Sequence, residues 1–194
     1  MRLYVPLTLP RLAVAHRQGE LDPLPLAAFA VTPALRAWCG SDDPEELEYA
    51  ALGRAALASL RLLADDAQAP RRRVVVAVDV ADEAVRSADE AVRSADEAVR
   101  SADKAVRPAG LDLDEAAVGQ VLVDAAVPFR KAAAVHVDAA GAEAAVAAGA
   151  EALPAADAGD ADAEATVEAA EEHDLLWYAT QEVAHLLADG PARG

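Results

Sequence analysis

The segment RRRVVVAVDV (residues 71–80) constrains the fold more than any other part of the chain. Its apolar run from Val74 to Val78 would place no polar residue on either face of a strand. Such a strand lies near the middle of a sheet that is covered on both faces. We therefore expect a sheet with helices packed against it. We interpret the basic run 71–73 as the charged edge of this strand.

Strands and helices alternate along the rest of the chain. Apolar patterns predict strands over residues 2–7, 23–32, 119–138 (two strands joined near Pro128) and 173–178. Helices are predicted from Thr8 to Gly19, from Thr32 to Trp38, over 43–66, in the alanine-rich stretch before Pro154, over 161–172, and after a cap at Thr180. This order predicts an α/β (α+β) fold with a single mixed β-sheet flanked by helices.

Residues 81–108 contain a tandem repeat, three copies of ADEAVRS followed by the related copy ADKAVRP. The spacing of Asp82 and Arg86 favours helical ion pairs, so the repeat predicts a long solvated helix. As a coiled-coil seam it is poor, because alanine fills every second core position and buries little area. We expect an insertion into one α/β domain made of residues 1–80 and 109–194. A dimer seam or a docking rod is the alternative.

The charge of the chain is concentrated in its C-terminal part. The formal net charge is −17, and residues 109–194 hold 17 acidic and only 3 basic residues. A surface of this kind repels phosphate backbones and anionic lipid, so we expect neither nucleic acid nor a membrane as partner. The complementary partner would be a protein with a basic surface.

Other features bear on the compartment. No apolar stretch reaches the length of a membrane span. Pro6, Pro10 and Arg11 interrupt the N-terminal apolar run, which argues against a secretory signal. Cys39 is the single cysteine, so no internal disulfide can form. We therefore expect a cytoplasmic location.

Known cofactor and metal motifs are missing from the sequence. Its ten glycines form no phosphate-binding loop, and its four histidines lack the spacing of a zinc site. The stretch DAGDADAE (157–164) lacks the residue order of a calcium loop. We therefore expect no cofactor and no bound metal.

Two groups of residues are candidates for function. In LLWYATQE, Trp177 and Tyr178 would lie on opposite faces of a strand, with Gln181 and Glu182 beginning the next helix. This pattern favours one aromatic in the core and the other in a binding contact. The alternative is an acid–base cluster of side chains from a helix N-terminus and a strand: Glu46, Glu48, Tyr49 and His136. Those carboxylates are explained equally well as a solvated first turn beside the helix dipole.

The order of the motifs RLYVPLTLPRL, AFAVTPALR, EELEYAA, RRRVVVAVDV, AAAVHVD and HDLLWYATQE resembles a family of uncharacterised proteins from high-GC Gram-positive bacteria, defined only as a domain of unknown function. The resemblance implies a small cytoplasmic single-domain protein. It implies no reaction, cofactor or catalytic residue.

Charge and motifs together predict a cytoplasmic, non-catalytic interaction or regulatory protein that binds a basic protein surface. The alternative is a small enzyme that acts on a small molecule with the Glu/Tyr/His cluster. The two differ in geometry, because an enzyme brings its acid–base groups into one pocket.

Overall fold

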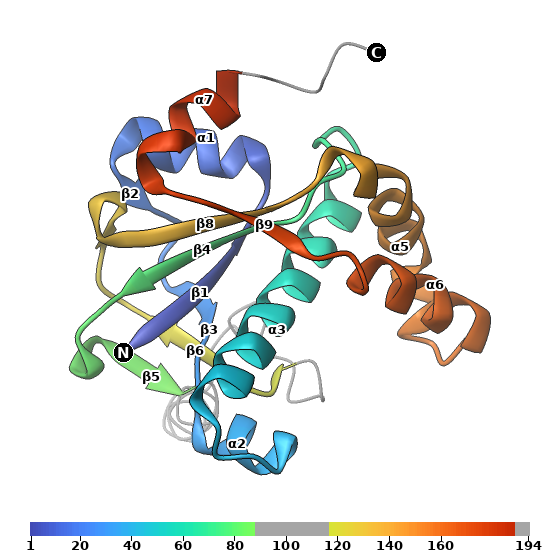
Figure 1. Ribbon diagram of the computed structural model, residues 1–194, viewed down its shortest axis with the longest axis horizontal. Helices are drawn as coiled ribbons and strands as arrows, with labels where there is room; N and C mark the ends of the chain where they lie inside the picture. Colours follow the sequence, from blue (N-terminus) through green and yellow to red (C-terminus); the bar gives the residue numbers. More distant parts are fainter. Residues whose placement is uncertain (88–116, 189–194) are drawn as a thin grey trace, which may run out of the picture.

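The computed structural model describes residues 1–87 and 117–188. Its main feature is a seven-stranded sheet with the strand order β5-β6-β3-β1-β4-β8-β9 (Figure 1). The strands of this sheet are β1 Arg2–Leu7, β3 Leu26–Phe29, β4 Val74–Asp79, β5 Val85–Ser87, β6 Gln120–Val123, β8 Ala132–Asp138 and β9 Leu175–Tyr178. Helices accompany the sheet, which confirms the expected α+β fold. We expected a mixed sheet, but all the pairings in the described residues are antiparallel.

The apolar strand β4 lies inside the sheet, between β1 and β8. The residues from Val74 to Val78 are all buried, which confirms that both faces of this strand are covered. Val74, Val76 and Val78 join one apolar core, whereas Val75 and Ala77 join another on the opposite face. The run of branched residues is therefore used on both sides.

One face of the sheet is covered by two short helices, α1 Leu9–Gln18 and α7 Val183–Ala188 (Figure 1). Helix α1 begins and ends as predicted, because Thr8 accepts a hydrogen bond from the Arg11 amide and Gly19 adopts a left-handed conformation. A small second sheet consists of two strands, β2 Glu20–Leu21 and β7 Val127–Pro128. Strand β2 follows α1 in the chain, and β7 is followed by the 3₁₀ turn Phe129–Lys131.

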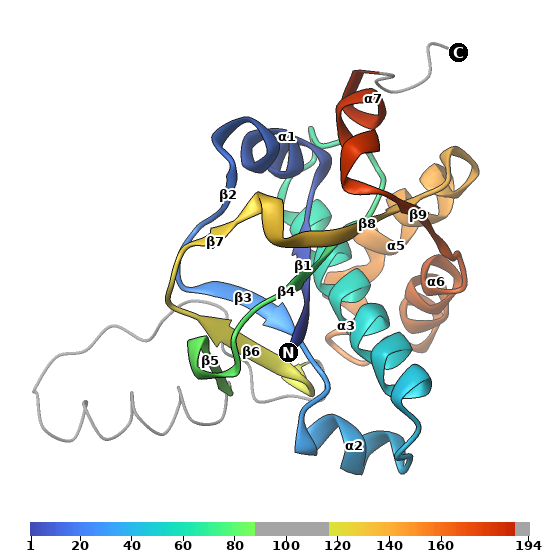
Figure 2. The ribbon, with the colours of Figure 1, turned by 60° about the vertical axis from the view of Figure 1, so that its left-hand side comes forward.

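The other face is covered by α3 Pro44–Asp65, with α2 Pro33–Cys39 before it (Figure 2). The Asp43 side chain accepts hydrogen bonds from the amides of Glu45 and Glu46, as is typical of a helix N-cap. A buried hydroxyl joins α3 to the sheet, because Ser59 donates to Leu7 O and accepts from Val74 N. These bonds fix α3 against the ends of β1 and β4.

Helices α5 Glu143–Ala156 and α6 Ala161–Glu171 form a hairpin that packs against α3. Gly149 permits the close approach of α5 and α6 within this hairpin, since a Cβ there would lie 2.7 Å from the Ala170 Cβ. Helix α5 follows the 3₁₀ turn Ala140–Ala142. We predicted that it would end before Pro154, but it continues to Ala156, three residues beyond the predicted end. Proline removes one donor near the C-terminus of the helix, where few intrahelical bonds remain to be lost.

The first copy of the heptad repeat does not form the predicted helix. In this copy, Asp82–Ala84 form a 3₁₀ turn and Val85–Ser87 form the edge strand β5, which pairs with β6. Val85 packs against the core, and Arg86 forms an ion pair with Asp124. Tertiary pairing has therefore overridden the local helix preference in this copy. The other copies lie outside the described residues.

The C-terminal helix also begins differently from our prediction. Thr180 is not its cap, since Thr180–Glu182 form a 3₁₀ turn ahead of α7. The Glu182 carboxylate instead accepts a hydrogen bond from the Ala179 amide at 2.7 Å.

Candidate functional site

A pocket of about 400 Å³ opens between α3 and the segment that leads into β9. Helix α3 forms one wall, and the end of α6 with the start of β9 forms the other. The lining residues are Tyr49, Leu52, Gly53, Ala56, Arg73, Glu171, His173, Asp174 and Leu175. The size is in the lower part of the range of small-ligand pockets.

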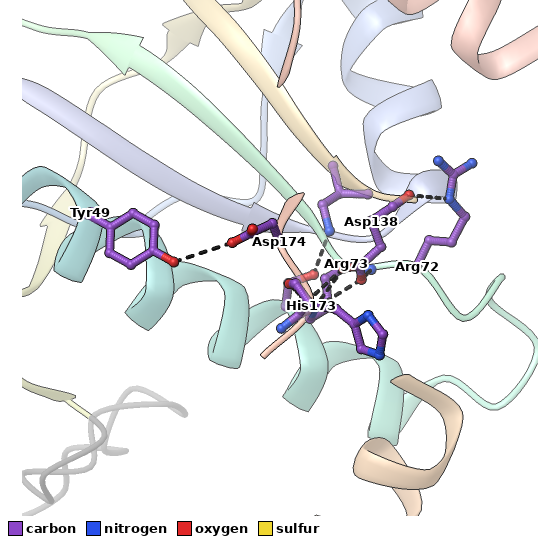
Figure 3. Close-up of polar contacts among 8 residues, drawn as sticks. Tyr49, Arg72, Arg73, Asp138, His173 and Asp174 are labelled. Atoms are coloured by element: carbon purple, nitrogen blue, oxygen red, sulfur yellow. Dashed lines mark hydrogen bonds and ion pairs between the residues drawn. The ribbon is translucent and has the colours of Figure 1, made fainter. Parts of the chain in front are cut away.

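A buried ion pair lies beside this pocket (Figure 3). The Arg73 Nη2 donates to Asp138 Oδ1 at 2.7 Å, and the side chains are 1% and 0% exposed. The Asp138 carboxylate also accepts from the Arg73 Nε and backbone amide, and Arg73 Nη2 donates to the His173 carbonyl. We interpreted the basic run 71–73 as the charged edge of the strand, but the Arg73 side chain is buried and paired with Asp138. Its guanidinium joins β4, β8 and the segment before β9.

Two carboxylates, those of Glu171 and Asp174, line the pocket. Asp174 accepts a hydrogen bond of 3.4 Å from the Tyr49 hydroxyl (Figure 3). The Glu171 carboxylate accepts no hydrogen bond from the described residues. Although the residue is exposed as a whole, partial burial raises the pKa of its carboxyl, while Arg73 and Arg54 act in the opposite direction. Because Asp138 already neutralises Arg73, the free charge of the pocket is negative.

The four residues of the acid–base alternative do not share one pocket. Tyr49 lines the pocket, whereas Glu46 accepts from the Ser41 hydroxyl in the first turn of α3. Glu48 accepts a hydrogen bond of 3.1 Å from Tyr4, and burial together with this carboxylate raises the pKa of Tyr4. His136 lies half-buried on β8 and is not among the residues that line the pocket.

His136 provides a test of the electrostatics of the sheet. Burial, and secondarily Arg2, lower the pKa of His136, so the fold favours its neutral form. The unfolded chain binds a proton near the ordinary pKa of about 6.5. We therefore expect the wild type to lose stability as the pH falls from about 7 toward the lowered pKa, at up to about 1.4 kcal/mol per unit of pKa difference.

The variant His136→Gln lacks this contribution, so its stability should fall less over the same range. Urea unfolding of both proteins at pH 7.5 and 5.0 measures the difference. A constant offset between the two proteins would contradict the assigned direction.

The residues of the predicted binding pattern are arranged along β9 and the turn after it. Tyr178 packs against the core, whereas Trp177 is 61% exposed on the opposite face, beside His136 in register. Gln181 lines a second pocket, of about 520 Å³, with His16 and Phe129. Glu182 is used to cap the turn. The predicted split between one core and one exposed aromatic therefore matches the geometry.

Strand β9 is also an edge of the sheet. Leu176, which sequence reasoning missed, is 47% exposed, so both faces of this edge present a large apolar side chain. Glu171, Glu172 and Asp174 lie just before the strand. An edge strand has unpaired amides and carbonyls along one side.

Sequence reasoning also missed Arg73, Asp138 and Gly53. The first two carried a usable signal, since opposite charges lay at the ends of two strongly apolar segments. Gly53 carried a weaker one, as a glycine inside an otherwise well-formed helix pattern. Glu171, His173 and Asp174 lie close to α3 only in the tertiary structure, so the sequence alone could not predict this proximity.

The described residues contain neither a candidate membrane span nor a candidate metal site. None of the helices within 1–87 and 117–188 combines the length and apolar character of a membrane span. Within the same ranges, no three histidine, cysteine, aspartate or glutamate side chains are grouped so that they could hold a metal ion.

Of the comparisons with known proteins, only the comparison with family models found a match. The chain matches no curated protein and no solved structure. A family model described as a family of unknown function (DUF6912) matches residues 1–187, which is nearly the whole chain. The chain therefore belongs to the DUF6912 family.

Proposed function

We propose that the protein is a non-catalytic interaction module that binds an extended, basic segment of a partner protein at the free edge of β9. The observation that carries the proposal is the exposure of Leu176 and Trp177, 47% and 61%, on opposite faces of an edge strand. An added strand would pair with the free backbone groups of β9 and would cover both side chains.

Exposure at this position is unusual enough to require an explanation. Natural edge strands are commonly protected by charged side chains, proline or bulges, because an apolar edge recruits other chains. Strand β5, at the opposite edge, has such protection, since it presents the charged Arg86. Strand β9 (LLWY) has no charged residue. The contrast supports β9 as the docking edge.

The surrounding charge supports a basic partner. Glu171, Glu172 and Asp174 are exposed beside the start of β9, and the net charge of the whole chain is −17. A basic segment would be attracted to this edge, and an acidic one repelled. Strand pairing would supply most of the affinity, while the charge would select the partner and speed its association.

The test uses a labelled ten-residue peptide with blocked ends, in which lysine alternates with valine (the lysine peptide). Fluorescence anisotropy measures its binding to the wild type, to Leu176→Lys and to Trp177→Ala. We expect each substitution to weaken binding by about tenfold or more, since it removes apolar contact that would be buried against the added strand. Raising the salt concentration to several hundred millimolar should weaken binding further.

Leu24→Lys is the matched control, because Leu24 is also 47% exposed but lies in the loop before β3. It makes the same change in charge and in apolar surface, so it should bind the lysine peptide like the wild type. A peptide with glutamate in place of lysine should bind much more weakly. Equal loss of binding in Leu24→Lys and Leu176→Lys would refute docking at β9.

A further inference from the structure

Gly53 has no structural reason to be glycine within the described residues. It lies in the interior of α3 with ordinary helical backbone, and a Cβ there would meet no atom within 4 Å. Glycine in a helix interior is less stable than alanine by about 0.5–1 kcal/mol. Gly149 differs, because a Cβ there would collide with Ala170. Gly53 thus keeps one wall of the α3–β9 pocket open at a cost in helix stability.

The pocket suits a cationic group on an apolar stem. Leu52, Ala56 and Leu175 supply apolar wall, while Glu171 and Asp174 supply carboxylates near the opening. Two cations of the neighbouring elements already have ionic partners, since Arg73 pairs with Asp138 and Arg61 with Asp157. The Arg54 guanidinium lies 4.4 Å from the centre of the Trp38 ring, and its Nε and Nη2 are buried without a hydrogen-bond partner among the described residues. No group within residues 1–87 and 117–188 donates a hydrogen bond to the Glu171 carboxylate, and a ligand could provide this donor.

The pocket lies next to the start of β9, the strand at which we propose docking. Leu175 both lines the pocket and begins β9, and it packs with the core under α3. Side chains of an added strand alternate between the two faces of the sheet. Those that point toward α3 near the start of β9 would therefore reach the opening of the pocket.

We propose that the α3–β9 pocket is a specificity subsite that accepts one lysine or arginine side chain of the docked segment, with its stem against Gly53 and Leu175 and its charged end at Glu171 and Asp174. This inference rests on the proposed docking at β9 and adds the residue that the docked segment must carry.

The test compares the lysine peptide with the same peptide acetylated on every lysine, which removes the charge but keeps the stem. We expect the wild type to prefer the lysine peptide by about tenfold or more, the size of one charge-assisted hydrogen bond. Glu171→Gln should abolish most of this preference. Gly53→Met, which fills the pocket from α3, should do the same, and its thermal midpoint should not fall, because methionine is the better helix former.

Glu164→Gln is the matched control, since this exposed residue of α6 does not line the pocket and its substitution makes the same change in net charge. It should keep the preference. If Glu164→Gln and Glu171→Gln reduce the preference equally, diffuse charge explains it and the subsite is refuted. If Gly53→Met binds the lysine peptide like the wild type, the pocket is not occupied and the subsite is refuted as well.

A second probe separates this inference from the docking proposal. N-acetyl-arginine methylamide at millimolar concentration should shift the amide resonance of Gly53 in the wild type, but not in Glu171→Gln. If no peptide binds the wild type while this shift occurs, docking at β9 is wrong and the cation pocket stands. If the shift does not occur, the pocket does not accept a basic side chain.

Discussion

Replacement of Asp138 by alanine should destabilise the protein by about 3–5 kcal/mol, because it leaves the Arg73 guanidinium buried without its counter-ion. The Arg73 backbone amide would lose its acceptor at the same time. In a domain of this size 1 kcal/mol corresponds to about 2–4 °C, so the thermal midpoint should fall by on the order of 10 °C. Calorimetry or thermal denaturation followed by circular dichroism measures this change.

An exposed ion pair of the same chemistry is the control. Arg61 and Asp157 are joined at 2.6 Å, but their side chains are 39% and 50% exposed. Solvent screens such pairs, so Asp157→Ala should cost about 1 kcal/mol or less. The double variant Arg73→Met with Asp138→Leu should recover part of the loss, since no unpaired charge remains. Equal effects of Asp138→Ala and Asp157→Ala would show that the Arg73–Asp138 pair is not buried in solution.

The Arg73–Asp138 pair also matters to the proposed site. Arg73 donates to the His173 carbonyl, and His173 and Asp174 form the wall of the pocket that leads into β9. The pair therefore holds this wall against β4 and β8. The bonds of Arg73 to Asp138 and to the His173 carbonyl account for a charged residue at the start of so apolar a strand.

Features that local chemistry determines could be predicted from the sequence. Thr8, Thr32 and Asp43 cap helices because their side chains reach amides two or three residues further along. The burial of β4 on both faces followed from its unbroken apolar run. In the site, the opposite orientations of Trp177 and Tyr178 followed from the two-residue period of a strand.

Features that depend on distant partners could not be predicted in this way. The segment from Asp82 to Ser87 has the composition of a helix, yet Val85 is partly buried in the core and the strand pairs with β6. Arg73 resembled a solvated residue until β8 placed Asp138 beside it. The pocket likewise depends on how closely α6 and β9 approach α3, and no periodicity in the sequence encodes that distance.

Replacement of Ser59 by alanine is the second change with a large expected effect. The Ser59 hydroxyl donates to Leu7 O at 2.6 Å and accepts from Val74 N at 2.9 Å, and its side chain is fully buried. Alanine would leave a carbonyl and an amide buried without partners, at about 1–3 kcal/mol for each group. We expect a loss of about 2–6 kcal/mol in urea unfolding, because the better helix propensity of alanine offsets little of this cost.

Thr166→Ala is the control for Ser59→Ala. The Thr166 hydroxyl also bonds to a backbone carbonyl, that of Asp162, but this bond lies within one helix and is exposed to solvent. Removal of this hydroxyl leaves no buried polar group without a partner, so the free energy of unfolding should change by less than about 0.5 kcal/mol. Because Ser59 fixes the helix that carries Tyr49 and Gly53, Ser59→Ala should also weaken the preference for the lysine peptide. Unchanged stability in Ser59→Ala would mean that α3 is held to the sheet by apolar packing alone.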